Sequence, residues 1–180
     1  TFGLATALLA PALAQRATPL QMGSIGDKPE LGTLHLNAGL GSFKIRPTDP
    51  DGKAEGRVEI SFTGSVLVSQ LDGQVVVSEG LTKEFDDLGR QIYHGTGTAV
   101  FTGRWRALQW FGRDMAATWY GRGLIQVIGE FDRDLKTGEY WFDDPDIKGA
   151  WPSTMWTLVL PEQRVGVIPG QVPKKRGEGN

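Results

Sequence analysis

The sequence predicts an all-β fold: a single-domain antiparallel β-barrel of about 8–10 strands in mostly meander order, with a β-sandwich as the alternative. Three observations support this class. The composition is rich in turn formers, with 25 glycines and 10 prolines in 180 residues. Apolar and polar residues alternate with period two, and short turn motifs separate the alternating segments. Because an open sheet of this many strands normally curls or splits, we expect closure or two packed layers.

Alternating segments appear first at 34–36, 43–45 and 58–62, where polar residues separate the apolar ones. In a strand, successive side chains point to opposite faces of the sheet. The pattern therefore predicts antiparallel strands with one buried face and one face toward solvent.

Turn motifs lie between the predicted strands. Asp72-Gly73, between SVLVSQL and QVVVS, is the strongest of them, because a two-residue hairpin turn needs positive φ at its central residues. Gly112-Arg113 suits a second two-residue turn, and the loop over 132–138 joins two further apolar segments. Successive hairpins of this kind predict a meander.

One short helix is expected over 81–88, with a loop as the alternative. Leu81, Phe85 and Leu88 are spaced i, i+4 and i+7, and Gly89 is placed to end a helix. The rest of the central region shows strand spacing.

Glycines inside strand-like segments favour a barrel. A glycine within a strand marks a bulge or a sharp bend, which barrel corners need. These glycines lie at positions 95, 97, 103, 121, 123 and 129. The segment YHGTGTAVFTG, residues 93–103, resembles segments of allene oxide cyclase-like and dirigent-like barrels. That resemblance covers this segment alone and assigns no role to any residue.

The two ends of the chain are expected to lie outside the folded domain. Residues 1–14, TFGLATALLAPALA, are uncharged and end in Ala-Leu-Ala, which predicts a truncated secretory signal peptide, with a buried helix as the alternative. Residues 15–31 are predicted to be a flexible segment, 32–160 the β-barrel domain, and 161–180 a disordered tail containing Pro and Lys. The expected location is secreted, or periplasmic/extracellular.

Composition argues against several function classes. The net charge is −2, whereas nucleic-acid binders normally carry a basic excess, so no nucleic acid is expected as a partner. The chain has no cysteine, which removes disulfides, thiol catalysis and thiolate metal sites. The apolar N-terminal run is shorter than the roughly 20 residues of a membrane-spanning helix, so no integral membrane span is expected.

The segment FTGRWRALQWFGRDMAATWYGRG carries three of the six tryptophans and four arginines. Strand alternation places Arg104, Arg106 and Trp110 on one face, with Tyr120 and Arg122 in the neighbouring column. Arginine forks bind carboxylates, sulfates and phosphates, and aromatic rings stack on sugars. These five residues are the predicted ligand-binding face, and an acidic glycan or another anionic ligand is the predicted partner.

A structural interpretation of the same arginines stays open. Residues 130–146 carry seven acids against Arg133 and Lys136. In a meander this segment would lie beside the basic one, and opposite charges on adjacent strands pair across a sheet.

The tryptophans can serve as core residues or as platforms for sugars, since planar rings do both. Trp105 and Trp119 are expected in the core. Trp110, Trp141 and Trp151 lie nearer turns or polar residues and are expected to be exposed.

The sequence offers no recognisable catalytic or metal motif. His35 and His94 are the only histidines, and neither lies in a nucleophile or zinc pattern. Asp-rich segments at 49–52, 132–134 and 143–146 lack the spacing of a calcium loop and are interpreted as turns. We assign no catalytic residue, metal or cofactor.

The predicted function is that of a secreted, extracytoplasmic, non-catalytic binding or structural β-protein. One alternative is a small secreted hydrolase or isomerase with its site in the barrel mouth, which needs buried carboxylates that converge with His94. Another is a self-assembling envelope protein. Segment 124–128 puts apolar residues, Leu124 and Ile128 among them, on both faces of its strand, which implies either that both faces are covered within the fold or that one is a homo-oligomer interface.

Overall fold

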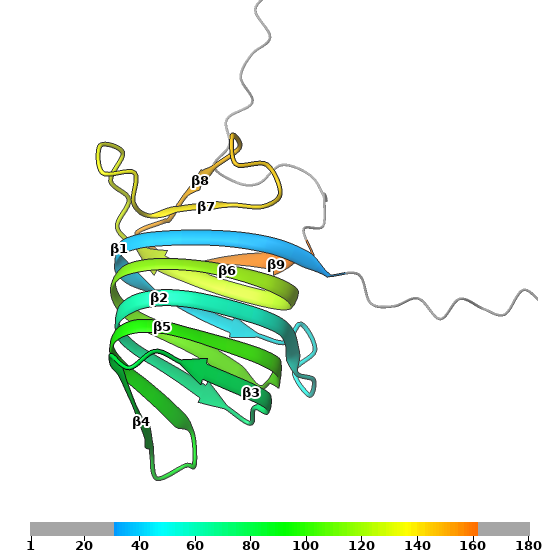
Figure 1. Ribbon diagram of the computed structural model, residues 1–180. Coiled ribbons are helices and arrows are strands. Elements are labelled where there is room, and N and C mark those ends of the chain that lie inside the picture. The colour runs from blue at the N-terminus through cyan, green and yellow to red at the C-terminus, as the bar shows by residue number, and fades with distance from the viewer. Residues whose placement is uncertain (1–30, 162–180) are drawn as a thin grey trace, which may run out of the picture.

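The computed structural model describes residues 31–161, and within this range every regular element is a β-strand (Figure 1). The strands are β1 (Gly32–Arg46), β2 (Ala54–Ser69), β3 (Asp72–Val77), β4 (Leu81–Phe85), β5 (Gln91–Trp105), β6 (Ala107–Gly129), β7 (Glu139–Trp141), β8 (Gly149–Ala150) and β9 (Trp156–Leu160). The predicted all-β class is therefore confirmed.

The helix expected over 81–88 is wrong. Leu81–Phe85 is strand β4, which pairs with β5. Of the three residues with helical spacing only Leu81 is buried, while Phe85 and Leu88 are 65% and 77% exposed. The three side chains share no buried face, which an amphipathic helix would have required.

The strands form one sheet in the order β3-β5-β2-β6-β1-β7-β8, and in addition β4 pairs with β5 and β9 pairs with β6. Along each ladder the residue numbers rise on one strand and fall on its partner, so the pairing is antiparallel. The predicted meander is wrong, because β6 separates β1 from β2, and β3 pairs with β5 rather than with β2.

Both predicted two-residue hairpin turns are also wrong, because the residues proposed for them lie within strands. Asp72 and Gly73 are the first residues of β3, and Gly112 and Arg113 lie inside β6. The loop predicted over 132–138 is present, since Asp132 and Thr137 bridge across it.

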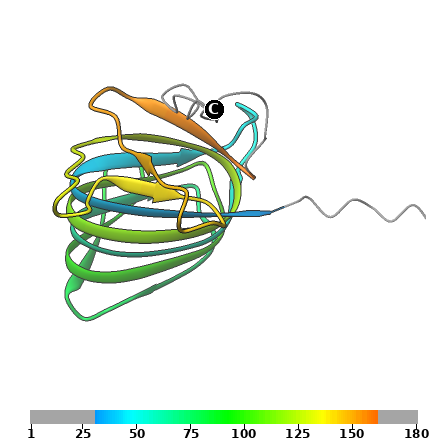
Figure 2. The ribbon, with the colours of Figure 1, turned by 90° about the horizontal axis from the view of Figure 1, so that it is seen from above.

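Four long strands, β1, β2, β5 and β6, fold over from one layer to the other (Figures 1 and 2). The pairing of β6 with β1 shows this most directly. Residues 108–121 of β6 run along one edge of β1, and residues 124–129 run along the other edge of its second half. A strand can meet both edges of its neighbour only if it wraps around that neighbour, so the sheet is curled on itself.

The curled sheet does not close into the predicted barrel. Strands β3 and β4 lie at one end of the strand order, and β8 and β9 lie toward the other. No ladder between residues 31 and 161 joins the two ends. The two-layered arrangement is compatible with the sandwich that the sequence left as the alternative.

Two rows of glycines cross the sheet where the strands fold. One row is Gly73, Gly103, Gly56, Gly121 and Gly32, and the other is Gly95, Gly64, Gly112, Gly41 and Gly129. At Gly56 the backbone has φ +134°, and a Cβ there would lie 2.0 Å from the Tyr120 carbonyl oxygen. Only glycine permits this backbone and this approach, so the strands can bend in register.

The core lies between the two layers and uses alternating positions of the strands. In β2, Val58, Ile60 and Phe62 are buried, whereas Glu59 and Ser61 are exposed, as the sequence pattern predicts. The curling therefore turns one face of the sheet inward throughout, which is what period-two patterning specifies.

Within residues 31–161 no helix is long and apolar enough to cross a membrane. The predictions of a signal peptide, a flexible segment and a tail fall almost wholly on residues 1–30 and 162–180, which lie outside the described residues. In β6, Ile125 and Val127 are buried in the core, and segment 124–128 carries half-buried apolar residues on its other side.

Candidate anion-binding site

The loop between β1 and β2, residues 47–53, separates two hollows at one end of the sheet. Pro47 and Thr48 line both hollows, so the loop is their shared wall. The first hollow has a volume of about 470 Å³ and the second about 420 Å³. Both volumes fall within the range of small-ligand sites, roughly 300–1,000 Å³.

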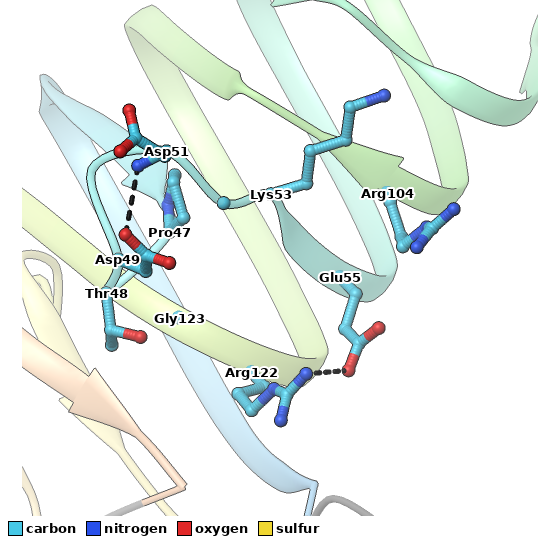
Figure 3. Close-up of a pocket in the computed structure, with 10 residues that line it drawn as sticks. Pro47, Thr48, Asp49, Asp51, Lys53, Glu55, Arg104, Arg122 and Gly123 are labelled. Atoms are coloured by element: carbon cyan, nitrogen blue, oxygen red, sulfur yellow. Dashed lines mark hydrogen bonds and ion pairs between the residues drawn. The ribbon is translucent and has the colours of Figure 1, made fainter.

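The first hollow brings cations and carboxylates together (Figure 3). Its charged lining residues are Lys53, Arg104, Arg122, Asp49, Asp51 and Glu55. Arg122 turns toward Glu55, with 2.8 Å between Nη2 and Oε1, and Asp49 accepts a hydrogen bond from the backbone N–H of Asp51. The charges of this hollow therefore largely neutralise one another.

The arginines of the first hollow belong to a ladder of alternating charge. Register places Asp72, Arg104, Glu55 and Arg122 side by side on β3, β5, β2 and β6. Arg104 donates to Asp72 at 2.9 Å, and this hydrogen bond, with the nearby positive charges, holds the pKa of Asp72 below its ordinary value. Such exposed pairs fix the register of neighbouring strands more than they stabilise the fold.

The second hollow contains cations without carboxylates. Its lining residues are Lys44, Arg46, Pro47, Thr48, Pro50, Arg106, Ala107 and Leu124. Lys44, Arg46 and Arg106 form no ion pair within the part of the chain that the structure describes. Three like charges thus lie around one hollow, and no carboxylate of residues 31–161 lines it or pairs with them.

Two of these cations differ in their hydrogen bonding. Arg106 donates from Nη1 to the carbonyl oxygens of Pro50 and Gly52, so the β1–β2 loop holds its guanidinium in place. The Nε of Arg46 is buried and has no hydrogen-bond partner among residues 31–161. Buried polar groups are normally paired, so this N–H is a donor in need of an acceptor.

The five residues of the predicted ligand-binding face divide between different places. Arg104 and Arg122 line the first hollow, and Arg106 lines the second. Tyr120 is 51% exposed on β6 but lines neither hollow. Trp110 is fully buried, so its place on the exposed face was wrong.

The misplacement of Trp110 has a local cause at Arg106. Strand β5 ends at Trp105, the chain bends at Arg106, and β6 begins at the next residue. Uninterrupted alternation would put Arg104 and Trp110 on one face. The bend shifts the pattern by one position, and Trp105 and Leu108 both enter the core.

Pairing of the arginines with the acidic segment 130–146 is also wrong. The arginines of the first hollow pair with carboxylates on β2 and β3 instead. In the acidic segment, the Asp132 and Asp144 carboxylates accept hydrogen bonds from backbone N–H groups two residues ahead, which confirms the interpretation as turns. Glu139 pairs locally with Lys148 at 2.9 Å.

The remaining tryptophans follow the predictions in part. Trp105 and Trp119 are fully buried, which confirms them as core residues. Trp151 is only 3% exposed, so its predicted exposure was wrong. Trp141 is half-buried and stacks on His35 with ring centroids 5.2 Å apart.

The described residues offer little that suits acid–base or metal chemistry. None of their polar or charged side chains is fully buried. His94 lies 3.8 Å from Glu84, and neither residue lines either of the two hollows described above. No group of three or more metal-ligating side chains occurs in residues 31–161. The arrangement instead suits reversible binding of an anion by fixed cations.

Sequence reasoning missed Lys44 and Arg46. Both alternate with the buried residues Phe43 and Ile45, so the pattern correctly turns them outward. The pattern does not indicate which strand lies next to β1. That strand is β6, and the pairing brings Arg46 opposite Leu124 and near the bend that contains Arg106. That long-range pairing has no local sequence signature.

The sequence matches no family model, and comparisons with curated proteins and with solved structures gave no significant match.

Proposed function

We propose that this chain is a secreted or periplasmic/extracellular, non-catalytic β-protein that binds an acidic glycan around the β1–β2 loop. The observation that carries the proposal is the gathering of six cationic side chains around that loop. They come from three strands and from the connections between strands: Lys44, Arg46, Lys53, Arg104, Arg106 and Arg122.

This gathering is local, because the whole chain carries a net charge of −2. Clustered cations on a chain with a slight acidic excess favour an anionic ligand at that place, without favouring polyanions over the entire surface. An acidic sugar suits the two hollows by size, and its charged groups suit the arginine forks.

The exposed ring of Tyr120 adds an aromatic element near the first hollow. It lies two residues before Arg122 on β6, and it pairs in register with Arg57 and Thr33. Aromatic faces stack on sugar rings, so a glycan that reaches out of the first hollow could continue over Tyr120.

The extracytoplasmic location is supported by the composition of residues 1–14. It is tested by sequencing the N-terminus of the protein isolated from its native host. A mature chain that begins at or near Gln15 in the extracytoplasmic fraction agrees with the proposal, and an intact leader on cytoplasmic protein contradicts it.

Glycan binding is tested by retention on immobilised polysaccharides at about 50 mM salt, where charge interactions are weakly screened. We expect retention on sulfated or uronic-acid polysaccharides and none on neutral dextran. The double variant Lys44→Gln/Lys53→Gln should elute at clearly lower salt. The matched control is Arg133→Gln/Lys136→Gln, which removes the same charge from the loop after β6.

Equal loss of retention in the two double variants would mean that net charge alone governs binding, and would contradict a site around the β1–β2 loop. Absence of retention on every acidic polysaccharide would contradict the proposed function itself.

A further inference from the structure

We infer that the second hollow is a subsite for a tetrahedral oxyanion, a phosphate or sulfate group carried on a ligand of monosaccharide size. The inference rests on the proposed function and deepens it, because it names which hollow holds the charged group and what that group is. Lys44, Arg46 and Arg106 are the residues that hold it.

The two hollows differ in their balance of charge. In the first, the guanidinium groups of Arg104 and Arg122 are already joined to carboxylates at 2.9 and 2.8 Å. An anion entering there would have to displace or compete with those carboxylates. In the second hollow no carboxylate lines the wall, so an incoming anion meets cations that are not paired with a carboxylate of the described residues.

The state of Arg46 is the second argument. Its Nε is shielded from solvent, and no described residue accepts its hydrogen bond. A shielded N–H that loses its water without gaining an acceptor raises the free energy of the folded state. Arg46 lines the hollow, so an anion bound there would balance the charge of its guanidinium and accept hydrogen bonds from its terminal Nη groups, which, unlike Nε, are not shielded.

Arg106 is fixed in advance for the same task. Its Nη1 is held by two loop carbonyls, those of Pro50 and Gly52, which leaves other N–H groups of the guanidinium for a ligand. A side chain held in place loses little conformational freedom on binding, which strengthens the interaction. Thr48 adds a hydroxyl group to the same wall.

The number of donors favours a tetrahedral group over a carboxylate. One guanidinium fork can occupy both oxygens of a carboxylate, and a phosphate or sulfate ester offers three acceptor oxygens instead. Here three separate cationic side chains line one hollow. The rest of the wall is apolar, formed by Pro47, Pro50, Ala107 and Leu124, and suits the carbon skeleton of a ligand. The volume of about 420 Å³ leaves room for one sugar ring beside the charged group.

The test is calorimetric titration with four probes: glucose 6-phosphate, glucose 6-sulfate, glucuronate and glucose. We expect both esters to bind, glucuronate to bind about tenfold more weakly or worse, and glucose not to bind. Arg46→Gln and Lys44→Gln should each weaken ester binding by about tenfold, the scale of losing one charged hydrogen bond. Lys53→Gln, which removes the same charge from the first hollow, should change the affinity by less than about twofold, as expected for an exposed, screened charge that does not line the second hollow.

A readout of stability separates a binding role from a structural one. Removal of a like-charged guanidinium whose Nε is shielded and unpaired should leave the melting temperature of the free protein unchanged or raise it, since no described residue accepts a hydrogen bond from that Nε. In wild type the esters should raise the melting temperature, and in Arg46→Gln this rise should be lost.

Four outcomes would overturn the inference. Glucuronate binding as tightly as the esters would contradict the tetrahedral group. Equal weakening by Lys53→Gln and Lys44→Gln would contradict the choice of hollow. Retention on acidic polysaccharides that depends on Lys53 and Arg122 but not on Lys44 or Arg46 would contradict the inference while the proposed function stands. If neither the esters nor any acidic polysaccharide binds, the inference and the proposed function are both wrong.

Discussion

At the scale of single residues, glycine decides whether the strands can fold over. Gly56 has φ +134°, a backbone region that only glycine occupies readily, and a Cβ would meet the Tyr120 carbonyl oxygen at 2.0 Å. We therefore expect Gly56→Ala to lower the free energy of unfolding by about 3 kcal/mol or more, measured by urea denaturation.

The matched control is Gly89→Ala. Gly89 also has positive φ, +70°, but a Cβ there would meet nothing within 4 Å. This change should cost about 1 kcal/mol from backbone strain alone. An equal loss in the free energy of unfolding for the two variants would contradict a contribution from the close approach of the neighbouring strand at Gly56.

A second residue-scale prediction concerns Asp86, whose carboxylate closes the turn between β4 and β5. It accepts hydrogen bonds from the backbone N–H of Leu88 and Arg90 and from the Arg90 side chain. The backbone hydrogen bond from Arg90, the largest contribution, and those from its side chain and from Leu88 hold the pKa of Asp86 below its ordinary 3.8. The stabilising effect is therefore present above that pH and disappears as pH falls through the lowered pKa.

We expect Asp86→Ala to melt below wild type near neutral pH, and the difference to shrink as pH falls through the lowered pKa of Asp86, because both chains then lack a charged carboxylate at this position. Melting curves by circular dichroism across the acidic range would check this. Asp87→Ala, at the exposed neighbour, should follow wild type at every pH. A difference for Asp86→Ala that persists undiminished in acid would show that the carboxylate charge is not the cause.

At the scale of elements, alternation predicts burial well wherever a strand continues without interruption. It placed Val58, Ile60 and Phe62 correctly in β2, and Trp119 correctly in the second part of β6. It failed at Trp110, because the bend at Arg106 shifts the pattern by one residue. A one-residue shift in the alternation exchanges the buried and exposed faces of a strand, and no local sequence feature predicts it here.

A second slip in β6 illustrates why the candidate site was harder to predict than the fold. Buried positions are even at Leu108 and Trp110 and odd from Met115 onward, and between them Asp114 has φ +51°. Opposite this point the register between β2 and β6 shifts, which identifies a bulge. The second hollow depends in the same way on β1 lying beside β6, a pairing set by the whole sheet.

The edge strand β3 provides a direct test of the observed faces. Val75 packs against the core, whereas its neighbour Val76 is 66% exposed. We expect Val75→Lys to lower the free energy of unfolding by about 1–3 kcal/mol, because it removes apolar contacts and brings a charge toward the core. Val76→Lys should stay within about 0.5 kcal/mol of wild type. Chemical denaturation of the two variants, which carry the same chemical change, measures the contrast; the reverse order of stability would contradict the register of β3.

At the scale of the whole molecule, the folding-over of long strands ties the two layers into one unit. Strand β2 pairs with β5 over residues 54–68 and with β6 over residues 55–61 and 63–69, so both neighbours accompany it on either side of Gly64, which lies in one of the glycine rows. In a sandwich built from separate strands, one layer can loosen while the other persists. Here the same covalent segments pass through both layers, so loss of one layer removes the ends of the strands that hold the other.

We therefore expect the two layers to unfold together. Native-state hydrogen exchange should give the backbone amides of Ile60 and Val66, buried residues of β2 on either side of its fold, the same free energy of opening, equal to that of global unfolding. Amides of the short strands β7 and β8, which pair over few residues, should exchange through smaller openings. A lower free energy of opening at Val66 than at Ile60 would mean that one layer unfolds alone. The hollows around the β1–β2 loop would then rest on a layer that can open independently, and anion binding would be expected to slow exchange in that layer selectively.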